Sequence, residues 1–150
     1  MKICIASDHR GFKLKNELLN YLKENYIIDD LGTYSDESVD YTKYAFLLGE
    51  KIRDHLYDFG IAICGSGIGI SIACNKVKGV RCAKVNTVID ARLTRNDNDA
   101  NVIALSGSLS IEEAKALVDT FLTTPFSNLE RHNKRINDIT KYENGEYYED

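Results

Sequence analysis

The segment from residue 58 to 75, DFGIAICGSGIGISIACN, constrains the fold more than any other part of the chain. An apolar run ends in Cys64, three closely spaced glycines follow, and a second apolar run begins at Ile68. The first run suits a strand buried on both faces, and the glycines suit a sharp turn or the close approach of a ligand. We therefore predict a strand, a tight turn and a helix that starts near Ile68.

The predicted turn has the properties of an anion site. A helix that starts at Ile68 directs its free backbone N–H groups and the positive end of its dipole toward the turn. The same field favours the thiolate form of Cys64, so this cysteine is the leading candidate for a reactive group. The alternative is a glycine-rich turn beside an inert, buried cysteine.

Three familiar functions of a glycine-rich turn do not fit this segment. A tyrosine-phosphatase loop needs an arginine six residues after its cysteine, and that position is Ile70. A dinucleotide fingerprint has the spacing G-x-G-x-x-G after the first strand, whereas Gly65, Gly67 and Gly69 follow the third predicted strand. A Walker loop requires Gly-Lys-Ser/Thr, and the segment does not contain it.

Length and composition narrow the class of protein. The 150 residues suit a single domain, residues 1–150, with one core. A net charge of −4 argues against general nucleic-acid binding, and no apolar run is long enough to predict a membrane span. The four cysteines form no C-x-x-C pair and have no histidine spacing suited to zinc, which favours reduced thiols and the cytoplasm.

Strands and helices are predicted to alternate along the chain. The predicted strands are residues 2–7, 26–28, 61–63, 80–85 and 102–105. The predicted helices are residues 11–25, 41–56, 68 onward, 87–95, 111–122 and 128–142. Asp40 is the expected cap of the second helix, Ser110 and Ser127 each begin a capping box, and Lys15 is expected outside the apolar stripe of the first helix. The alternation predicts an α/β, Rossmann-like, doubly wound sheet of five parallel strands.

Two remote turns are predicted to share one edge of this sheet. If the first and third strands are neighbours, Asp8 and His9 lie beside the turn that follows Cys64. A thiol, a carboxylate, an imidazole and an anion-binding turn are the groups expected for proton transfer on a phosphorylated small molecule. On the last helix, Arg131 and Arg135 project from one face and form either a phosphate clamp or a solvated basic stripe.

With these residues described, the chain resembles the type B ribose-5-phosphate isomerase family, which also includes allose-6-phosphate and galactose-6-phosphate isomerases. The resemblance covers nearly the whole chain. It rests on SDHRGFKLK at 7–15, LGT and DY around Leu31 and Asp40, ICGSGIGISIACNK at 63–76, NDANV at 98–102 and RHNKR at 131–135. It implies a Rossmann-like fold, no metal or other cofactor, and a homodimer or homotetramer with shared active sites and a C-terminal helix that extends to a partner subunit.

The resemblance also implies roles for individual residues. Cys64 moves a proton between C1 and C2 through a cis-enediolate, which interconverts D-ribose 5-phosphate and D-ribulose 5-phosphate in the pentose phosphate pathway. Ser66 and the backbone amides of the turn stabilise the enediolate oxygen, and Asp8 opens the sugar ring together with the residue at position 97. The residues that match substrate-binding positions are His9, Gly65, Gly67, Ile68, Gly69, Asn98, Arg131 and Arg135.

Two positions depart from the family pattern. Asp97 stands where many members have the ring-opening histidine, and a carboxylate accepts the anomeric proton but is a poor acid for the ring oxygen. We predict that Asp97 still faces the sugar; the alternative is a cap of the preceding helix or exposure to water. Ser108 stands where many relatives have a phosphate-binding arginine. The alternative functions are a hexose 6-phosphate isomerase and a non-catalytic sugar-phosphate-binding module.

Overall fold

The computed structural model describes residues 1–147. Its strands are β1 (Lys2–Ser7), β2 (Ile27–Asp30), β3 (Phe59–Cys64), β4 (Cys82–Lys84) and β5 (Val102–Ser106). Its helices are α1 (Phe12–Leu22), α2 (Tyr41–Arg53), α3 (Ile68–Cys74), α4 (Val88–Asn96), α5 (Ile111–Thr123) and α6 (Glu130–Glu143). The strands are all parallel in the order β2-β1-β3-β5-β4, which confirms the predicted Rossmann-like sheet. Among the described helices, none is long and apolar enough to cross a membrane.

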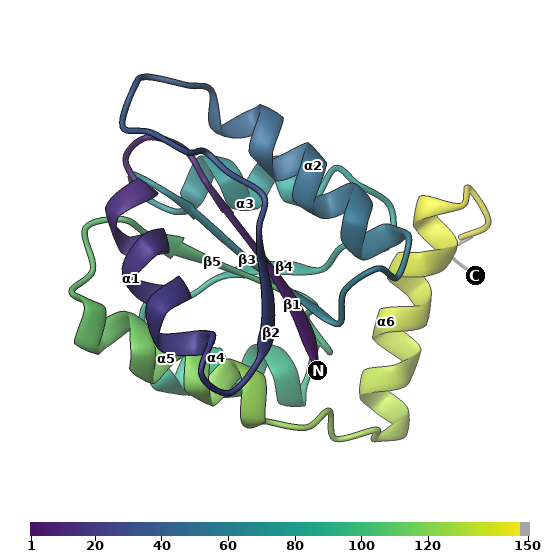
Figure 1. Ribbon diagram of the computed structural model, residues 1–150. Helices are drawn as coiled ribbons and strands as arrows, with labels where there is room; N and C mark the ends of the chain where they lie inside the picture. Colours follow the sequence, from purple (N-terminus) through teal and green to yellow (C-terminus); the bar gives the residue numbers. More distant parts are fainter. Residues whose placement is uncertain (148–150) are drawn as a thin grey trace.

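Helices cover both faces of the sheet (Figure 1). Helices α1, α4 and α5 pack on one face, and α2 and α3 pack on the other. Because side chains alternate along a strand, Ile61 and Ile63 face the first layer while Ala62 and Cys64 face the second. The central strand β3 therefore has no polar face, as expected for a strand that is buried on both sides.

The strand order brings the predicted turns together. Ser7 at the end of β1 pairs with Ile63, and Cys64 at the end of β3 pairs with Ser106. The carboxyl ends of β1, β3 and β5 thus form one edge, and the Asp8 N–H donates to the Ile63 carbonyl oxygen at 3.1 Å. This confirms that the turns after β1 and β3 are neighbours.

Several element ends differ from the prediction. Helix α1 ends at Leu22 rather than at residue 25, and α2 ends at Arg53, shortly before His55 turns into a left-handed conformation with φ of 57°. Asp40 stands at the N-cap position of α2, directly before Tyr41, but its side chain makes no capping hydrogen bond. The capping box at Ser110 is confirmed, with both of its hydrogen bonds present.

The predicted capping box at Ser127 is wrong. Helix α6 starts at Glu130, two residues later than predicted, and its cap residue is Leu129. The Ser127 hydroxyl lies 2.7 Å from His132 Nδ1 and also accepts the Leu129 N–H at 3.3 Å. The chain between them passes through Asn128, whose φ is 57°. The Ser127 side chain thus pairs with His132, and the reciprocal hydrogen bonds of a capping box do not form.

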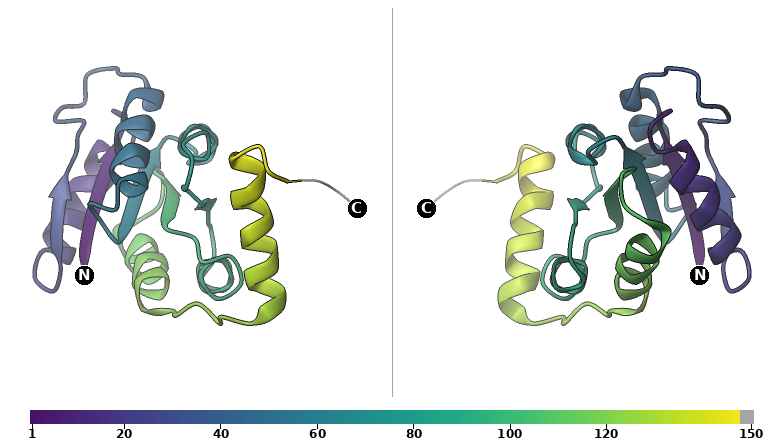
Figure 2. Two further views of the ribbon diagram at one scale, coloured as in Figure 1. Left: turned by 90° about the vertical axis from the view of Figure 1, so that its right-hand side faces the viewer. Right: turned by 90° about the vertical axis from the view of Figure 1, so that its left-hand side faces the viewer.

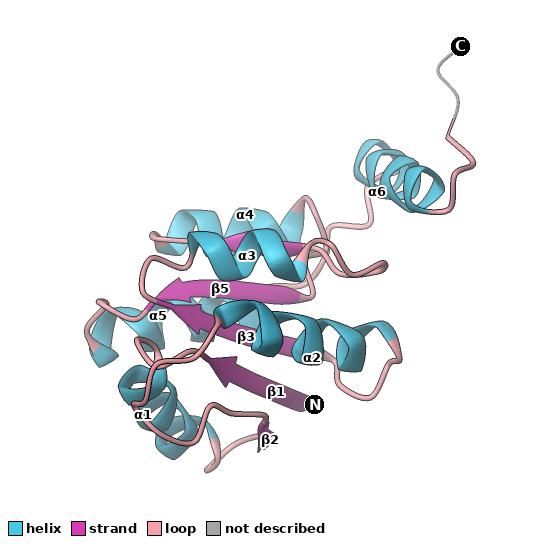
Figure 3. Ribbon diagram, turned by 90° about the horizontal axis from the view of Figure 1, so that it is seen from above, coloured by secondary structure: helices cyan, strands magenta, loops and turns pink. Residues whose placement is uncertain are grey.

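Helix α6 stands apart from the two helical layers, beyond the β4 edge (Figures 2 and 3). His132 is its one buried residue, near the helix start. Near the other end, Glu143 Oε2 accepts the Gly79 N–H at 2.8 Å. The helix is therefore fastened at both ends and leaves most of its surface uncovered within this chain.

The prediction for Lys15 is also wrong, because this side chain is fully buried. Its ammonium group lies 2.7 and 2.8 Å from the two carboxylate oxygens of Asp30, at the end of β2. Asp30 Oδ1 also accepts the Gly32 N–H at 2.9 Å, and the Gly32 carbonyl oxygen accepts the Ser7 N–H at 2.7 Å. The ion pair thereby links α1 to the backbone that supports the end of β1.

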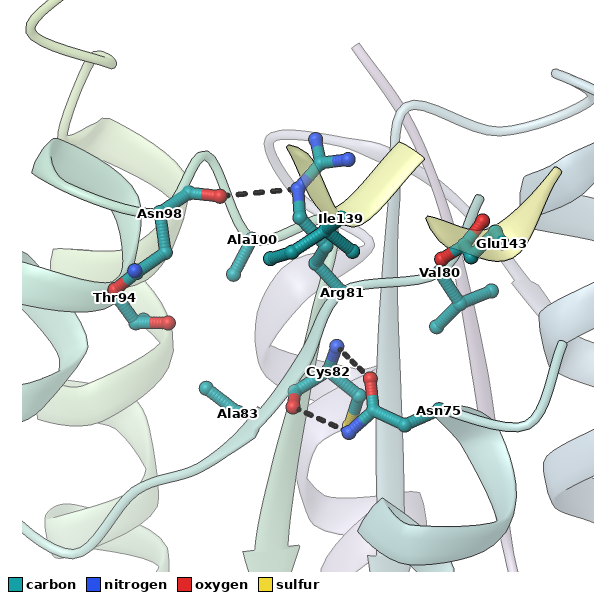
Figure 4. Close-up of a pocket in the computed structure, with 10 residues that line it drawn as sticks. All are labelled: Asn75, Val80, Arg81, Cys82, Ala83, Thr94, Asn98, Ala100, Ile139 and Glu143. Atoms are coloured by element: carbon teal, nitrogen blue, oxygen red, sulfur yellow. Dashed lines mark hydrogen bonds between the residues drawn. The ribbon is translucent and has the colours of Figure 1, made fainter. Parts of the chain in front are cut away.

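The outer edge of β4 is closed by a side chain rather than by another strand. The Asn75 amide donates to the Cys82 carbonyl oxygen and accepts the Cys82 N–H, both at 2.8 Å (Figure 4). These are the two hydrogen bonds that a neighbouring strand would make with Cys82. Asn75 thus covers an otherwise unpaired strand edge.

Candidate active site

Cys64 ends β3 and opens directly into the glycine turn. Its side chain is buried, and the Gly67 N–H donates to Sγ at 3.2 Å. Gly67 has φ of 78°, and a Cβ on it would stand 2.8 Å from the Leu105 carbonyl carbon. Only glycine fits this position without strain, so the turn that directs an amide at the sulfur depends on Gly67.

The other groups of the turn are partly occupied by one another. The Ser66 hydroxyl accepts the Ile68 N–H at 3.1 Å, and Gly65 presents its carbonyl oxygen to the Ser106 hydroxyl at 2.7 Å. Ser106 is in turn 2.7 Å from the Ser108 hydroxyl. Two of the predicted oxyanion donors therefore already have partners. The Gly67 N–H is bonded to the Cys64 sulfur, and the Ile68 N–H is bonded to the Ser66 hydroxyl.

Asp8 lies on the neighbouring turn and is held by backbone donors. Its Oδ1 atom accepts the N–H groups of Arg10 and Gly11 at 2.9 and 3.1 Å. The residue is buried, yet its carboxylate is stabilised by these two bonds. The carboxylate is thus fixed in orientation at the same edge of the sheet as Cys64.

His9 is held by the loop between β2 and α2. Its Nδ1 atom lies 3.2 Å from both the backbone N and the backbone O of Val39. These contacts occupy Nδ1, which leaves Nε2 for other partners. The half-buried ring is therefore oriented from the side opposite Nε2.

Arg10 is a cation that the sequence reasoning missed at this edge. It is exposed, and its side chain lies over Gly65, where a Cβ would stand 2.8 Å from Arg10 Cδ and 3.6 Å from Nη1. Its place directly after His9 is the signal that was available. The arrangement adds a positive charge next to the turn, where it favours anions.

The remaining predicted residues lie at the opposite edge of the sheet. Asp97 follows the last turn of α4, and Asn98 lies between α4 and β5. A strand rises about 3.3 Å per residue, so the length of β5 separates these residues from Cys64 by more than roughly 10 Å. Arg131 and Arg135 are exposed on α6, which also lies away from the carboxyl edge (Figures 1 and 3). Within one chain, Asp8 and His9 therefore lie near Cys64. The residues on α4, on the loop after it and on α6 do not.

A cavity of about 370 Å³ lies on the β4 side of the molecule, away from Cys64 (Figure 4). Asn98, Arg81 and Ile139 are among its lining residues, so it lies between β4, the end of α4 and α6. The Asn98 carbonyl oxygen accepts Arg81 Nε at 3.0 Å. We place the chemistry at the Cys64 turn instead. Several of the polar residues that line the cavity are bonded to one another, and most of its other lining side chains are apolar.

The four free cysteines differ in their surroundings. Burial raises the pKa of Cys4 to about 12. A hydrogen bond with Cys74, together with burial, raises the pKa of Cys82 well above its usual value. Cys64 is the cysteine that receives a turn amide at its sulfur. The structure therefore singles it out by geometry, as the sequence did by its place in the motif.

Comparison with known proteins agrees with this site and fold. The ribose/galactose isomerase family model matches residues 3–139. Ribose-5-phosphate isomerase B of Escherichia coli is 40% identical over 144 residues, which cover 95% of this chain and 96% of the relative. The structure of Clostridium thermocellum ribose-5-phosphate isomerase B matches with a TM-score of 0.94 and 41% identity, covering 98% of this chain and 100% of that one.

A further solved structure is that of Mycoplasma genitalium ribose-5-phosphate isomerase B with bound ribulose-5-phosphate. It matches with a TM-score of 0.90 and 41% identity, covering 95% of this chain and 96% of that one. Both the sequence and the fold are thus shared over almost the whole length. The chain belongs to the ribose/galactose isomerase family.

Proposed function

We propose that the chain is an aldose–ketose isomerase that interconverts D-ribose 5-phosphate and D-ribulose 5-phosphate, as a step of the pentose phosphate pathway. The observation that carries the proposal is the Gly67 N–H at 3.2 Å from Cys64 Sγ, beside a fixed Asp8 carboxylate. The ribose-5-phosphate isomerases among the relatives support the choice of a pentose. The reaction as proposed uses protein groups alone and needs no cofactor.

The chemistry begins with the open-chain sugar. The Cys64 thiolate takes the proton from C2 of ribose 5-phosphate, and the C1 oxygen gains the negative charge of a cis-enediolate. The hydroxyl proton passes from O2 to O1, and the thiol returns its proton to C1 to give ribulose 5-phosphate. Backbone amides of the turn and the Ser66 hydroxyl stabilise the enediolate oxygen, and one such donor contributes about 3–4 kcal/mol in comparable sites.

The site is completed by a second copy of the chain in a homodimer or homotetramer. His9 lies with Cys64, whereas Asp97, Asn98, Arg131 and Arg135 lie beyond reach in the same chain. In a second subunit, the arginines bind the phosphate, Asn98 contacts the sugar, and Asp97 acts with Asp8 in ring opening. Helices α3 and α4 lie on either side of β4 (Figure 2). Both carry exposed apolar residues, which supports an intersubunit surface there. These residues are Ile68, Ile72, Val88 and Ile89.

Turnover assays with three substrates test the proposal. Purified protein is given D-ribose 5-phosphate, D-allose 6-phosphate and D-galactose 6-phosphate, and kcat/KM is measured for each. Preference for ribose 5-phosphate is expected, and preference for either hexose 6-phosphate would replace the proposed substrate. Tight binding without turnover of any of the three would instead identify a non-catalytic sugar-phosphate-binding module.

The four free thiols suit the cytoplasm, which we propose as the compartment of this protein.

A further inference from the structure

A buried histidine joins α6 to the segment that carries Asp97. His132 is 6% exposed, and its Nδ1 atom lies 2.7 Å from the Ser127 hydroxyl. That hydroxyl already accepts the Leu129 N–H, so the arrangement that uses its hydrogen donates it to His132 Nδ1. The neutral imidazole then carries its proton on Nε2.

The protonated nitrogen faces Asp97. His132 Nε2 lies 3.7 Å from Asp97 Oδ1, and the Asn96 side-chain amide donates to that same oxygen at 2.7 Å. The Asn96 amide is therefore hydrogen-bonded to this carboxylate oxygen, and His132 Nε2 lies beside it, beyond hydrogen-bond distance. The Asp97 side chain is 39% exposed, so its second oxygen, Oδ2, has access to a ligand.

We propose that His132 is a positioning residue that turns Asp97 Oδ2 toward the sugar for ring opening. This inference rests on the proposed function. Oδ2 takes the proton of the anomeric hydroxyl, the bond between C1 and the ring oxygen breaks as C1 gains its carbonyl, and the carboxyl group returns the proton to the ring oxygen. Asp97 ends in its starting state, so it serves as both base and acid for this proton transfer in the ring opening that it shares with Asp8.

The fixed orientation of Asp97 explains how a carboxylate, a poor acid for the ring oxygen, can act at this position. A free aspartate is seldom protonated near neutral pH and is therefore a poor source of protons. Here the proton it donates is the one that it has just accepted, and the same oxygen faces both sugar atoms. The Asn96 hydrogen bond to Oδ1 and the His132 ring beside it keep that oxygen from competing and hold the side chain in one rotamer.

His132 also fastens α6, so the test must separate positioning from a general loss of structure. The assay follows initial consumption of ribose 5-phosphate, which is mainly cyclic, and of ribulose 5-phosphate, which has an open chain. His132→Ala is expected to lower kcat/KM for ribose 5-phosphate at least about tenfold, part of the roughly 100-fold or more that acid–base catalysis contributes. Ribulose consumption is expected to stay within about twofold, because it does not require ring opening.

Four further variants sharpen the assay. His132→Gln restores part of the lost activity, since its amide can accept from Ser127 and donate to Asp97. In an Asp97→Asn background, His132→Ala has no further effect, because both changes act on one step. His55→Ala is the matched control, since this histidine is exposed. A spectroscopic readout accompanies them. Nitrogen chemical shifts of His132 are expected to show that the neutral form of the ring is protonated on Nε2, and Ser127→Ala is expected to lose that preference.

Equal losses in the two directions after His132→Ala would overturn the inference, because they would indicate a loosened α6. A His132 ring protonated on Nδ1 in the unaltered protein would do the same. If the unaltered protein converts neither ribose 5-phosphate nor ribulose 5-phosphate, the proposed function fails and this inference fails with it. An active protein with equal losses overturns the inference alone.

Discussion

Cys64 differs from the other cysteines in both position and surroundings, and this difference predicts its reactivity. Cys64→Ala is expected to abolish turnover while substrate still binds. Iodoacetamide is expected to label Cys64 faster than Cys4 or Cys82, whose raised pKa values keep them as thiols. Mass spectrometry of digested protein measures the labelling, and bound substrate is expected to slow it. Near-normal activity of Cys64→Ala would remove this residue from the mechanism.

The glycines of the turn are expected to tolerate substitution unequally. Gly67→Ala places a Cβ against the backbone of Leu105 at a positive φ, so we expect it to lower the free energy of unfolding by about 1–3 kcal/mol and to abolish activity. Gly65→Ala meets the flexible side chain of Arg10 instead, which can move aside. Urea denaturation of both variants measures the difference. Equal destabilisation by the two changes would contradict this account of the turn.

Between α1 and β2, the buried ion pair predicts an asymmetry between its partners. Asp30→Ala leaves the fully buried Lys15 ammonium without a counter-charge, at a cost of roughly 3–5 kcal/mol. Lys15→Met is expected to destabilise less, because the Asp30 side chain is 27% exposed and water can solvate it. Thermal and urea unfolding give the comparison, with Lys13→Met as the exposed control. A larger loss in Lys15→Met than in Asp30→Ala would refute this explanation.

The contact between β2 and the loop before β3 predicts a dependence on alkaline pH. Tyr57 donates to Asp29 Oδ2 at 2.6 Å, and this bond raises the pKa of Tyr57 to about 12 from its usual value near 10. The bond's contribution to stability is therefore complete below about pH 10 and is lost as the pH rises toward 12. The stability difference between the unaltered protein and Tyr57→Phe is expected to narrow over that range in urea titrations. A constant difference would show that the bond does not titrate.

The bounds of a helix or strand could be predicted from the sequence only where neighbouring residues determine them. β1 could be predicted to its ends because an apolar run stops at the polar Ser7-Asp8-His9 turn. α6 could not, because the Ser127 hydroxyl pairs with His132 rather than making the predicted capping box. Lys15 was misplaced although it lies three residues before Leu18, on the same side of α1. Its partner Asp30 comes from another element, and no helical pattern reveals such a pairing.

At the scale of the whole molecule, the sequence predicted that Asp8 lies near Cys64, because the order of the strands alone determines this proximity. The places of Asp97 and Arg131 relative to Cys64 were not predictable in the same way. Their motifs give roles by resemblance, whereas their position depends on the path of α4 and α6 in space. The structure puts them at the far side of the chain, which makes assembly a condition of the proposed function.

Complementation between an inactive variant and one with weakened substrate binding tests this condition. Cys64→Ala is mixed with a variant that carries both Arg131→Ala and Arg135→Ala, which alone is expected mainly to raise KM. A heterodimer would contain one site with an intact cysteine and intact arginines. After random exchange in a twofold dimer, about a quarter of the unaltered activity is expected. If heterodimers form, as shown by native mass spectrometry, and activity does not return, the sites are not shared.

The amide of Asn75 has a consequence for how copies of this molecule meet. An uncovered outer strand can recruit a strand from another chain, and repeated recruitment produces fibrils. Asn75 satisfies both backbone groups of Cys82 at the place where such growth would start. Side chains on the neighbouring helices remain free to attract another copy, while the peptide backbone offers no template there. The molecule can thus associate through its surface near Cys82 without extending its sheet from that residue.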